Sequence, residues 1–231
     1  MASSLDNAIV HLRNPDETAR RLAAEDLGDW GDVAAVEPLV GVLSDPSPAV
    51  REAALDALVR IGGEPVVRAV LTALRSDYVP LRNAACFLLG QLGETAAGHL
   101  AALLTDADKD VRLFAIDTLG SIGSRSAEAG IIRALEDADV NVAAAAAAAL
   151  GEIGTDSTVP ALIAALASDG WVRCAVAKSL GQIGSLDAVR ALTTLAQDED
   201  TLVAYAATKA LAETDDGHNP RQETLGEGAQ P

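Results

Sequence analysis

The segment Leu27-Gly28-Asp29-Trp30-Gly31 recurs along the chain, and this repetition decides the fold. Five further copies are Leu58-Val59-Arg60-Ile61-Gly62, Leu89-Gly90-Gln91-Leu92-Gly93, Leu119-Gly120-Ser121-Ile122-Gly123, Leu150-Gly151-Glu152-Ile153-Gly154 and Leu180-Gly181-Gln182-Ile183-Gly184. A degenerate seventh copy begins at Leu211. The leading leucines recur with a nearly constant period of about 30 residues, which is typical of repeat proteins.

The residues ahead of each leading leucine repeat as well. The seventh residue before it, called position 0 below, is Arg20, Arg51, Arg82, Arg112, Ala143, Arg173 or Ala204. The residue before position 0 is always apolar. Position +3 is alanine in six units and Val176 in the sixth unit, and a small residue there predicts close packing of neighbouring helices.

Each unit is predicted to form two helices. The first carries apolar residues at helical spacing, as in Val36, Leu39, Val40 and Leu43. A turn rich in Ser, Asp and Pro follows, and such residues favour the start of the next helix. The second helix contains position 0 and ends at the last glycine of the recurring segment. We therefore expect an all-α fold, a right-handed α-α superhelix of seven two-helix repeats.

The pattern Asp…Val-Arg-x-x-Ala-x-x-x-Leu-Gly-x-Ile-Gly, in units of about 30 residues, resembles the PBS-lyase HEAT-like repeat family. The resemblance runs from about Leu5 to Glu213 and implies a HEAT-like solenoid over residues 1–214. Residues 215–231 are almost without apolar side chains, which predicts a disordered acidic and polar tail. Because this repeat serves many unrelated functions, the resemblance implies a fold more than an activity.

The charge of the chain limits its partners. The 34 acidic and 17 basic residues give a net charge of −17, and three of the basic residues are lysines. This charge argues against nucleic acid and against anionic membranes as partners. The composition resembles that of proteins from salt-loving archaea, so a haloarchaeal member of the family is expected; the alternative is an acidic mesophilic protein. With no stretch long enough to span a membrane and no secretion signal, a cytoplasmic location is expected.

Residues that could carry chemistry are few and scattered. His11, His99 and His218 lie far apart in sequence, which predicts no metal site and no cofactor. Cys86 and Cys174 lie three repeats apart and are expected to be free thiols. One HEAT-repeat enzyme, deoxyhypusine hydroxylase, holds iron with His-Glu dyads, which this chain lacks. The repeated Asp and Arg residues are expected to form a structural ladder of ion pairs and helix caps, so no catalytic residue is assigned.

Residues that differ between repeats are better candidates for a binding site. On the second helices, positions +1, +5 and +8 lie opposite the apolar face, and the small residues at +8 are expected to keep a concave groove open. The predicted partner-binding strip consists of Asn83, Phe87, Leu113, Ile116, Trp171, Cys174, Lys178, Tyr205 and Lys209. An alternative is that Phe87, Leu113 and Ile116 pack between helices. Trp30 is expected in the core and Trp171 on the surface.

These observations favour a non-enzymatic scaffold or adaptor that binds a protein or peptide in its groove; a small-molecule ligand is not expected. The alternative comes from the family resemblance alone. It is a bilin-lyase-like subunit that attaches or isomerises a tetrapyrrole together with a second HEAT-like chain.

Overall fold

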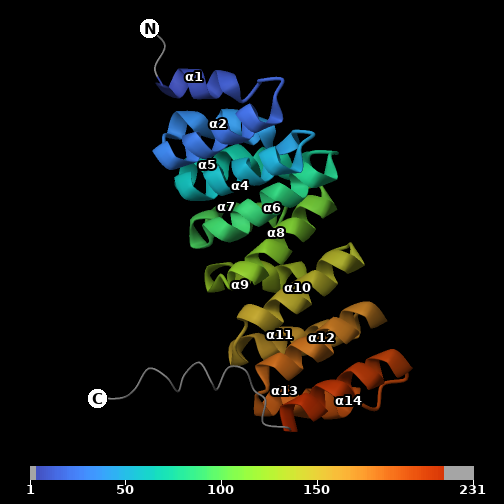
Figure 1. Cartoon of the computed structure of the whole chain (residues 1–231). Coiled ribbons are helices and arrows are strands. Elements are labelled where there is room, and N and C mark those ends of the chain that lie inside the picture. Colours follow the sequence, from blue (N-terminus) through green and yellow to red (C-terminus); the bar gives the residue numbers. More distant parts are fainter. Residues whose placement is uncertain (1–3, 216–231) are drawn as a thin grey trace. The chain divides into compact units, whose positions relative to one another are not determined.

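The computed structural model describes residues 4–215, and these residues form fourteen α-helices and no strand. The helices alternate between shorter and longer ones, so that seven hairpins follow one another along the chain (Figure 1). The predicted all-α class of an α-solenoid is confirmed. The predicted tail lies almost wholly in residues 216–231, which are outside the described part. Two compact units, Met1–His99 and Leu100–Pro231, make up the chain.

The N-terminal unit contains three complete hairpins. They pair α1 (Ser4–His11) with α2 (Glu17–Trp30), α3 (Val36–Gly41) with α4 (Pro48–Ile61), and α5 (Gly63–Leu71) with α6 (Val79–Leu92). Short 3-10 turns extend the first helices of the second and third hairpins, at Val42–Ser44 and Thr72–Arg75. The helix α7 (Glu94–Leu103) begins in this unit.

The C-terminal unit places its longer helices side by side. These are α8 (Lys109–Ile122), α10 (Val140–Ile153), α12 (Gly170–Ile183) and α14 (Thr201–Asp215). Each packs against the next in this order. The shorter helices α9 (Glu128–Ala134), α11 (Val159–Ala164) and α13 (Leu186–Leu195) connect them.

The ends of the second helices follow the predicted signals. Asp16, Asp108, Asp139 and Asp169 each stand at a helix start and accept a hydrogen bond from a backbone N–H of the first turn. The last glycine of the recurring segment takes a left-handed conformation after α2 and α8, with φ of 67° at Gly31 and 76° at Gly123. The local sequence therefore sets where each of these helices begins and ends.

The core is built largely from alanine. The alanines at position +3 are buried in all six units that carry them, and Val176 is buried in the sixth. Helices with methyl groups at their contact can approach closely. This confirms the packing role that the repeat pattern predicts for position +3.

The small residues at position +8 were predicted to keep the floor of a groove open, and several of them instead lie against a neighbouring helix. A Cβ on Gly28 would lie 2.7 Å from the Cα of Ala57, and one on Gly181 would lie 2.8 Å from the Cβ of Ala210. Gly120 likewise faces Ala149 at 3.1 Å. At these three positions the prediction was wrong, because the glycines are the points where one second helix touches position +6 of the next, whereas a Cβ on Gly90 would meet nothing within 4 Å.

The Asp-Arg ladder is present within both units. Arg20 Nε donates to Asp45 Oδ2 at 2.8 Å, and Arg112 Nε donates to Asp137 Oδ2 at 2.7 Å. Arg173 Nη2 donates to Asp198 Oδ1 at 3.3 Å. Each pair joins position 0 of one repeat to the turn ahead of the next second helix, which confirms the structural interpretation of these residues. The arginine hydrogen bonds hold the pKa values of Asp45 and Asp137 below the usual range.

Candidate partner-binding surface

The N-terminal unit contributes two of the predicted strip residues. Asn83 and Phe87 are one helical turn apart on α6, and both are exposed. Half of the Phe87 side chain is open to solvent, at 50%. Tyr78 and Val79 at the start of the same helix are also exposed. Phe87 is therefore not buried between helices, and half of it is available to a partner.

Ile116 on α8 lies in the core. Its exposed fraction is 0%, and Ala24, Ala147 and Ala177, which occupy the same +4 position in other repeats, are equally buried. In these four repeats position +4 therefore faces a neighbouring helix, and Ile116 does not belong to the surface strip. Leu113, at position +1 of α8, is half-buried.

The five remaining candidates form two parallel rows in the C-terminal unit. Trp171, Cys174 and Lys178 lie along α12 with spacings of three and four residues. Tyr205 and Lys209 occupy the corresponding positions on α14. Spacings of three and four residues place side chains on one face of a helix, and α12 packs against α14. The structure thus brings these five residues onto adjacent helices.

Leu202 completes the row on α14, and it was missed in the prediction from sequence. It stands three residues before Tyr205, as Trp171 stands three residues before Cys174. Leu202, Tyr205 and Trp171 are exposed to 70%, 69% and 64%. The signal in the sequence was the repeated spacing of three and four residues, which matches 202, 205 and 209 with 171, 174 and 178. We call these six residues the α12–α14 surface.

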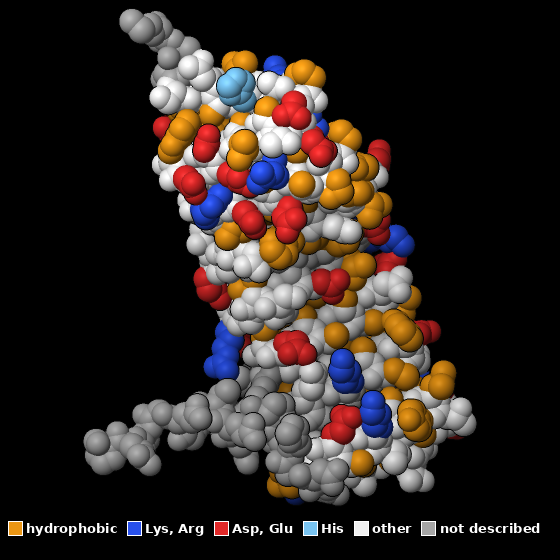
Figure 2. Space-filling view, in the orientation of Figure 1, with side chains coloured by type: hydrophobic (Ala, Val, Ile, Leu, Met, Phe, Trp, Pro, Cys, Tyr) orange, Lys and Arg blue, Asp and Glu red, His pale blue; other side chains and the backbone are white. Residues whose placement is uncertain are grey.

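The two ends of the α12–α14 surface carry opposite charge. Asp169, Asp198, Glu199 and Asp200 stand at the N-terminal ends of the two helices, where Arg173 is paired with Asp198. Lys178 and Lys209 stand seven residues beyond Trp171 and Leu202, and both are exposed. Figure 2 shows basic side chains beside hydrophobic ones over α12 and α14. The apolar residues therefore lie between an acidic end and a basic end.

Cys174 is a half-buried thiol within this surface, and neither it nor Cys86 forms a disulfide, as predicted. Burial, and then the charge of Asp200, raise the pKa of the Cys174 thiol. A raised pKa keeps the sulfur protonated and a poor nucleophile. Cys174 therefore offers apolar contact area to the surface.

The neighbouring helix α10 carries only short side chains at the matching positions. Its positions +1 and +5 are Ala144 and Ala148, and Ala144 is buried. The large side chains of α12 therefore lie beside a stretch of methyl groups on α10.

The carboxyl of Asp117 on α8 is exposed to solvent, yet partial burial raises its pKa.

Trp30 is exposed to 48%, so its predicted place in the core was wrong. It is the last residue of α2, at the position that Ile61, Leu92 and Ile122 occupy half-buried and Ile153 and Ile183 occupy buried in later repeats. Cover at this position therefore differs from repeat to repeat, and at Trp30 it is incomplete.

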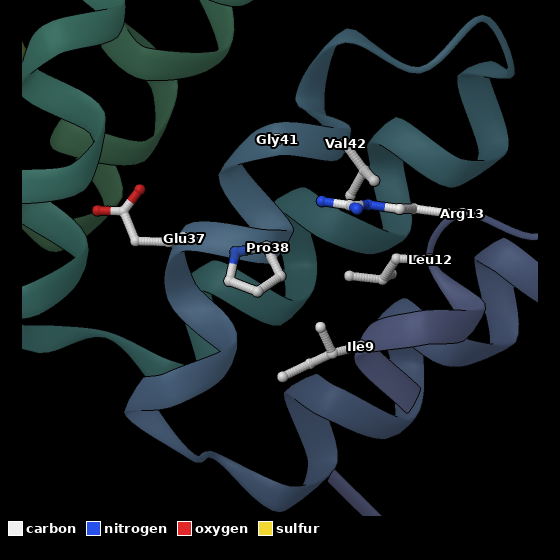
Figure 3. A pocket seen from close by; sticks show the side chains of 7 residues that line it. All are labelled: Ile9, Leu12, Arg13, Glu37, Pro38, Gly41 and Val42. Carbon is white, nitrogen blue, oxygen red and sulfur yellow. The ribbon is translucent and has the colours of Figure 1, made fainter. Parts of the chain in front are cut away.

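A separate hollow lies in the N-terminal unit between the first two hairpins. It has a volume of about 480 Å³ and is lined mainly by Ile9, Leu12, Pro38 and Val42. Figure 3 shows Arg13 lying near Val42, whereas Glu37 points away from the other side chains. No signal in the sequence pointed to this hollow, because it depends on how closely two short helices meet.

The histidines take part in different local contacts. His99 Nε2 lies 2.8 Å from Glu64 Oε1, and Arg68 Nε donates to the same oxygen at 2.7 Å. Arg68, followed by His99, lowers the pKa of Glu64. His11 ends α1, and His218 lies outside the described residues. Within residues 4–215, no three His, Cys, Asp or Glu side chains are grouped closely enough to hold a metal ion.

None of the described helices has the length and apolar character needed to cross a membrane.

Comparisons with known proteins agree with this architecture. The family model described as HEAT repeats matches residues 5–90, 96–173 and 167–225. The Escherichia coli protein YibA has a similar structure, with 21% identity and a TM-score of 0.53, covering 92% of this chain and 79% of that chain. No curated protein matches the sequence.

Two further solved structures are enzymes or parts of enzymes. Human deoxyhypusine hydroxylase is 22% identical, with a TM-score of 0.48, and the match covers 92% of this chain and 84% of that chain. The CpcE–CpcF complex of phycocyanin lyase from Nostoc sp. is 24% identical, with a TM-score of 0.39 and coverage of 93% and 96%. At these identities the similarities show the fold alone. With the repeat matches spanning most of its length, the chain belongs to the HEAT-repeat family.

Proposed function

We propose that this chain is a non-enzymatic adaptor that binds a partner protein or peptide through the α12–α14 surface. The observation that carries the proposal is the exposure of Trp171, Leu202 and Tyr205 on two adjacent helices. Large apolar side chains that cluster on a surface mark interaction sites more often than scattered ones do. Trp and Tyr are also the residue types that contribute most to binding when they are buried at an interface.

The repeated architecture supports the same proposal. The Asp-Arg pairs and the small residues at position +3 recur in several units, and the +8 glycines Gly28, Gly120 and Gly181 allow close contact between second helices. The α12–α14 surface occurs once, because only the last two repeats carry Trp or Leu at position −2 and Lys at position +5. A binding site must differ from the scaffold that carries it, and these residues do.

The adaptor is proposed to work in a salt-rich archaeal cytoplasm. The support is the net charge of −17 together with the small number of lysines. At molar salt the Debye length falls to about 3 Å, so that repulsion between surface carboxylates is largely screened. Neither nucleic acid nor an anionic membrane is the proposed partner, because both would be repelled.

The test is affinity capture from a salt-rich archaeal extract in molar KCl, followed by mass spectrometry. The wild-type chain is compared with the double variant Trp171→Ala/Tyr205→Ala. A matched control is Trp30→Ala/Tyr78→Ala, which removes one exposed Trp and one exposed Tyr from the N-terminal unit. Loss of a central aromatic residue from an interface typically costs about 2 kcal/mol or more, which is roughly 30-fold in affinity.

We expect the control to retain the captured protein and the Trp171/Tyr205 variant to lose it. Equal capture by all three proteins would place binding elsewhere on the chain. Failure of the wild type to capture any protein would contradict the adaptor proposal itself.

A further inference from the structure

The α12–α14 surface carries carboxylates at one end and lysines at the other, and this order of charges specifies the chemistry of its partner. The inference rests on the proposed function, because it names the kind of segment that the surface binds. Its starting point is that the two rows are equivalent: each begins with an apolar residue, continues with Cys174 or Tyr205 and ends with a lysine.

The spacing within the rows sets the distance between the first apolar residue of each row and its lysine. Lys178 and Lys209 follow the first apolar residue of each row by seven positions, which is about 10 Å along a helix at 1.5 Å per residue. Two of the three lysines in the whole chain stand at this end of the surface. They place two ammonium groups at one end of the surface on a protein of net charge −17.

The two lysines differ in how they are engaged. Lys209 Nζ lies 3.7 Å from Glu213 Oε1, and both side chains are well exposed. Such an exposed pair is weak and can exchange for a partner's carboxylate at little cost. Lys178 forms no ion pair with any residue of the described range 4–215. At least one of the two ammonium groups is therefore open to a ligand.

The opposite end of the surface is acidic. Asp169 and Glu199 are exposed there, and Asp200 Oδ2 lies 3.9 Å from Arg173 Nη2, which is already held by Asp198. The single arginine does not neutralise these carboxylates. A partner that carried negative charge over its whole length would consequently be repelled at this end.

We propose that the surface selects a peptide segment in which a basic residue, apolar residues and an acidic residue follow one another in space. The apolar residues contact Trp171, Leu202, Cys174 and Tyr205. The acidic residue lies at the far end of the two rows and pairs with Lys178 and Lys209, while the basic residue faces the carboxylates near Asp169. Charge complementarity of this kind fixes the orientation of a bound segment more than it raises its affinity.

The test is a selection from a displayed library of random 16-residue peptides on immobilised full-length protein. It is run at the lowest KCl concentration at which the wild type keeps its helical circular dichroism spectrum. The same library is selected on Lys178→Glu/Lys209→Glu, which reverses the charge at one end and leaves the apolar residues in place. Circular dichroism confirms that this variant is folded.

We expect peptides selected on the wild type to carry an acidic residue on one side of an apolar core and a basic residue on the other. Peptides selected on the charge-reversed variant should carry basic residues on both sides. A synthetic wild-type-selected peptide should bind the neutral variant Lys178→Gln/Lys209→Gln about three- to tenfold more weakly, because two exposed ion pairs are lost.

Several results would overturn the inference while leaving the adaptor proposal open. One is enrichment of the same peptides on the wild type and the charge-reversed variant. Others are the enrichment of no peptide, or tighter binding of a single-stranded oligonucleotide than of any selected peptide. Failure of the affinity capture described above would instead contradict the adaptor proposal, so the two failures are distinguishable.

Discussion

At the scale of single residues, Arg20, Arg112 and Arg173 at position 0 each make two separate contacts. The Nη1 atom donates to backbone carbonyls of the turn before its own helix, as Arg112 does to Asp106 at 2.8 Å. The other nitrogens pair with an aspartate of the next repeat, as Arg112 does with Asp137. Arg51 keeps the first contact, to Asp45 at 2.7 Å, although Ser76 stands where the aspartate would be. The arginine therefore holds its own turn even where the ion pair is lost.

Replacing Asp137 with Asn should weaken the C-terminal unit measurably. The half-buried carboxylate accepts hydrogen bonds from Arg112 Nε and Nη2, both at 2.7 Å, and one from the backbone N–H of Asp139. Hydrogen bonds to charged groups contribute about 1.5–3 kcal/mol each, so we expect the free energy of unfolding to fall by about 1–3 kcal/mol at pH 7. Urea unfolding followed by circular dichroism measures the change.

The same pair predicts the direction of the pH dependence. Because the folded pKa of Asp137 is below its unfolded value, the stabilisation is fully present above about pH 4 and is lost as the pH falls through the folded pKa. The difference between the wild type and Asp137→Asn should therefore shrink on acidification. The control Asp29→Asn breaks the exposed pair with Arg60 and should change stability by less than about 1 kcal/mol at any pH. A constant difference down to pH 2 would contradict this account.

At the scale of helices, the distance between neighbouring second helices depends on glycines at position +8. Gly28 on α2 touches the backbone of Ala57 on α4. Gly90 occupies the same +8 position on α6, yet a Cβ there would meet nothing within 4 Å. One repeated sequence position therefore has two structural roles, which makes the two glycines a matched pair.

Gly28→Ala should destabilise the chain, and Gly90→Ala should stabilise it. In the first variant the new methyl would lie 2.7 Å from a backbone atom, so the helices must separate, at a cost of about 1–3 kcal/mol. In the second, alanine replaces glycine within a helix without a clash, which gains about 0.5–1 kcal/mol. Thermal unfolding of both variants measures the shifts, and a shift of the same sign in both would show that helix–helix contact is not the deciding factor.

The sequence predicted the helices well because their signals are local and repeated seven times. The Asp caps, the buried alanines and the Gly stops each depend on neighbouring residues of one repeat. Side chains at the margin between buried and exposed positions could not be assigned in the same way. Ile116 and Trp30 were misplaced because their exposure depends on the adjacent helix. Leu202 was missed because a large apolar residue occupies that position only in the last two repeats.

At the scale of the whole molecule, acidic charge is the dominant property. The net charge of −17 is spread over a chain whose exposed residues include many unpaired carboxylates, such as Glu52 and Asp56 on α4. Like charges on a compact protein oppose folding through mutual repulsion. Salt reduces this repulsion because the Debye length falls from about 10 Å at 0.1 M to about 3 Å at 1 M.

The melting temperature should therefore rise by several degrees between 0.1 M and 2 M KCl. Scanning calorimetry measures the increase. The control variant Glu52→Gln/Asp56→Asn/Glu136→Gln/Glu199→Gln removes four exposed carboxylates and should show a smaller increase, because less repulsion remains to be screened. A melting temperature that falls with KCl would mean that the ion-pair ladder outweighs the repulsion.

The ion pairs of the ladder also affect how such a chain can gain repeats by duplication. Each pair takes its arginine from one repeat and its aspartate from the next, so a duplicated repeat arrives with both halves of a new junction. Between the fifth and sixth repeats, Ala143 and Ser168 stand where the arginine and the aspartate would be, so both halves are absent, whereas Arg51 is present without its aspartate at Ser76. The stack therefore tolerates a junction that lacks one half or both. New copies can be added to such a chain without redesign, and a single junction can lose its pair without loss of the fold.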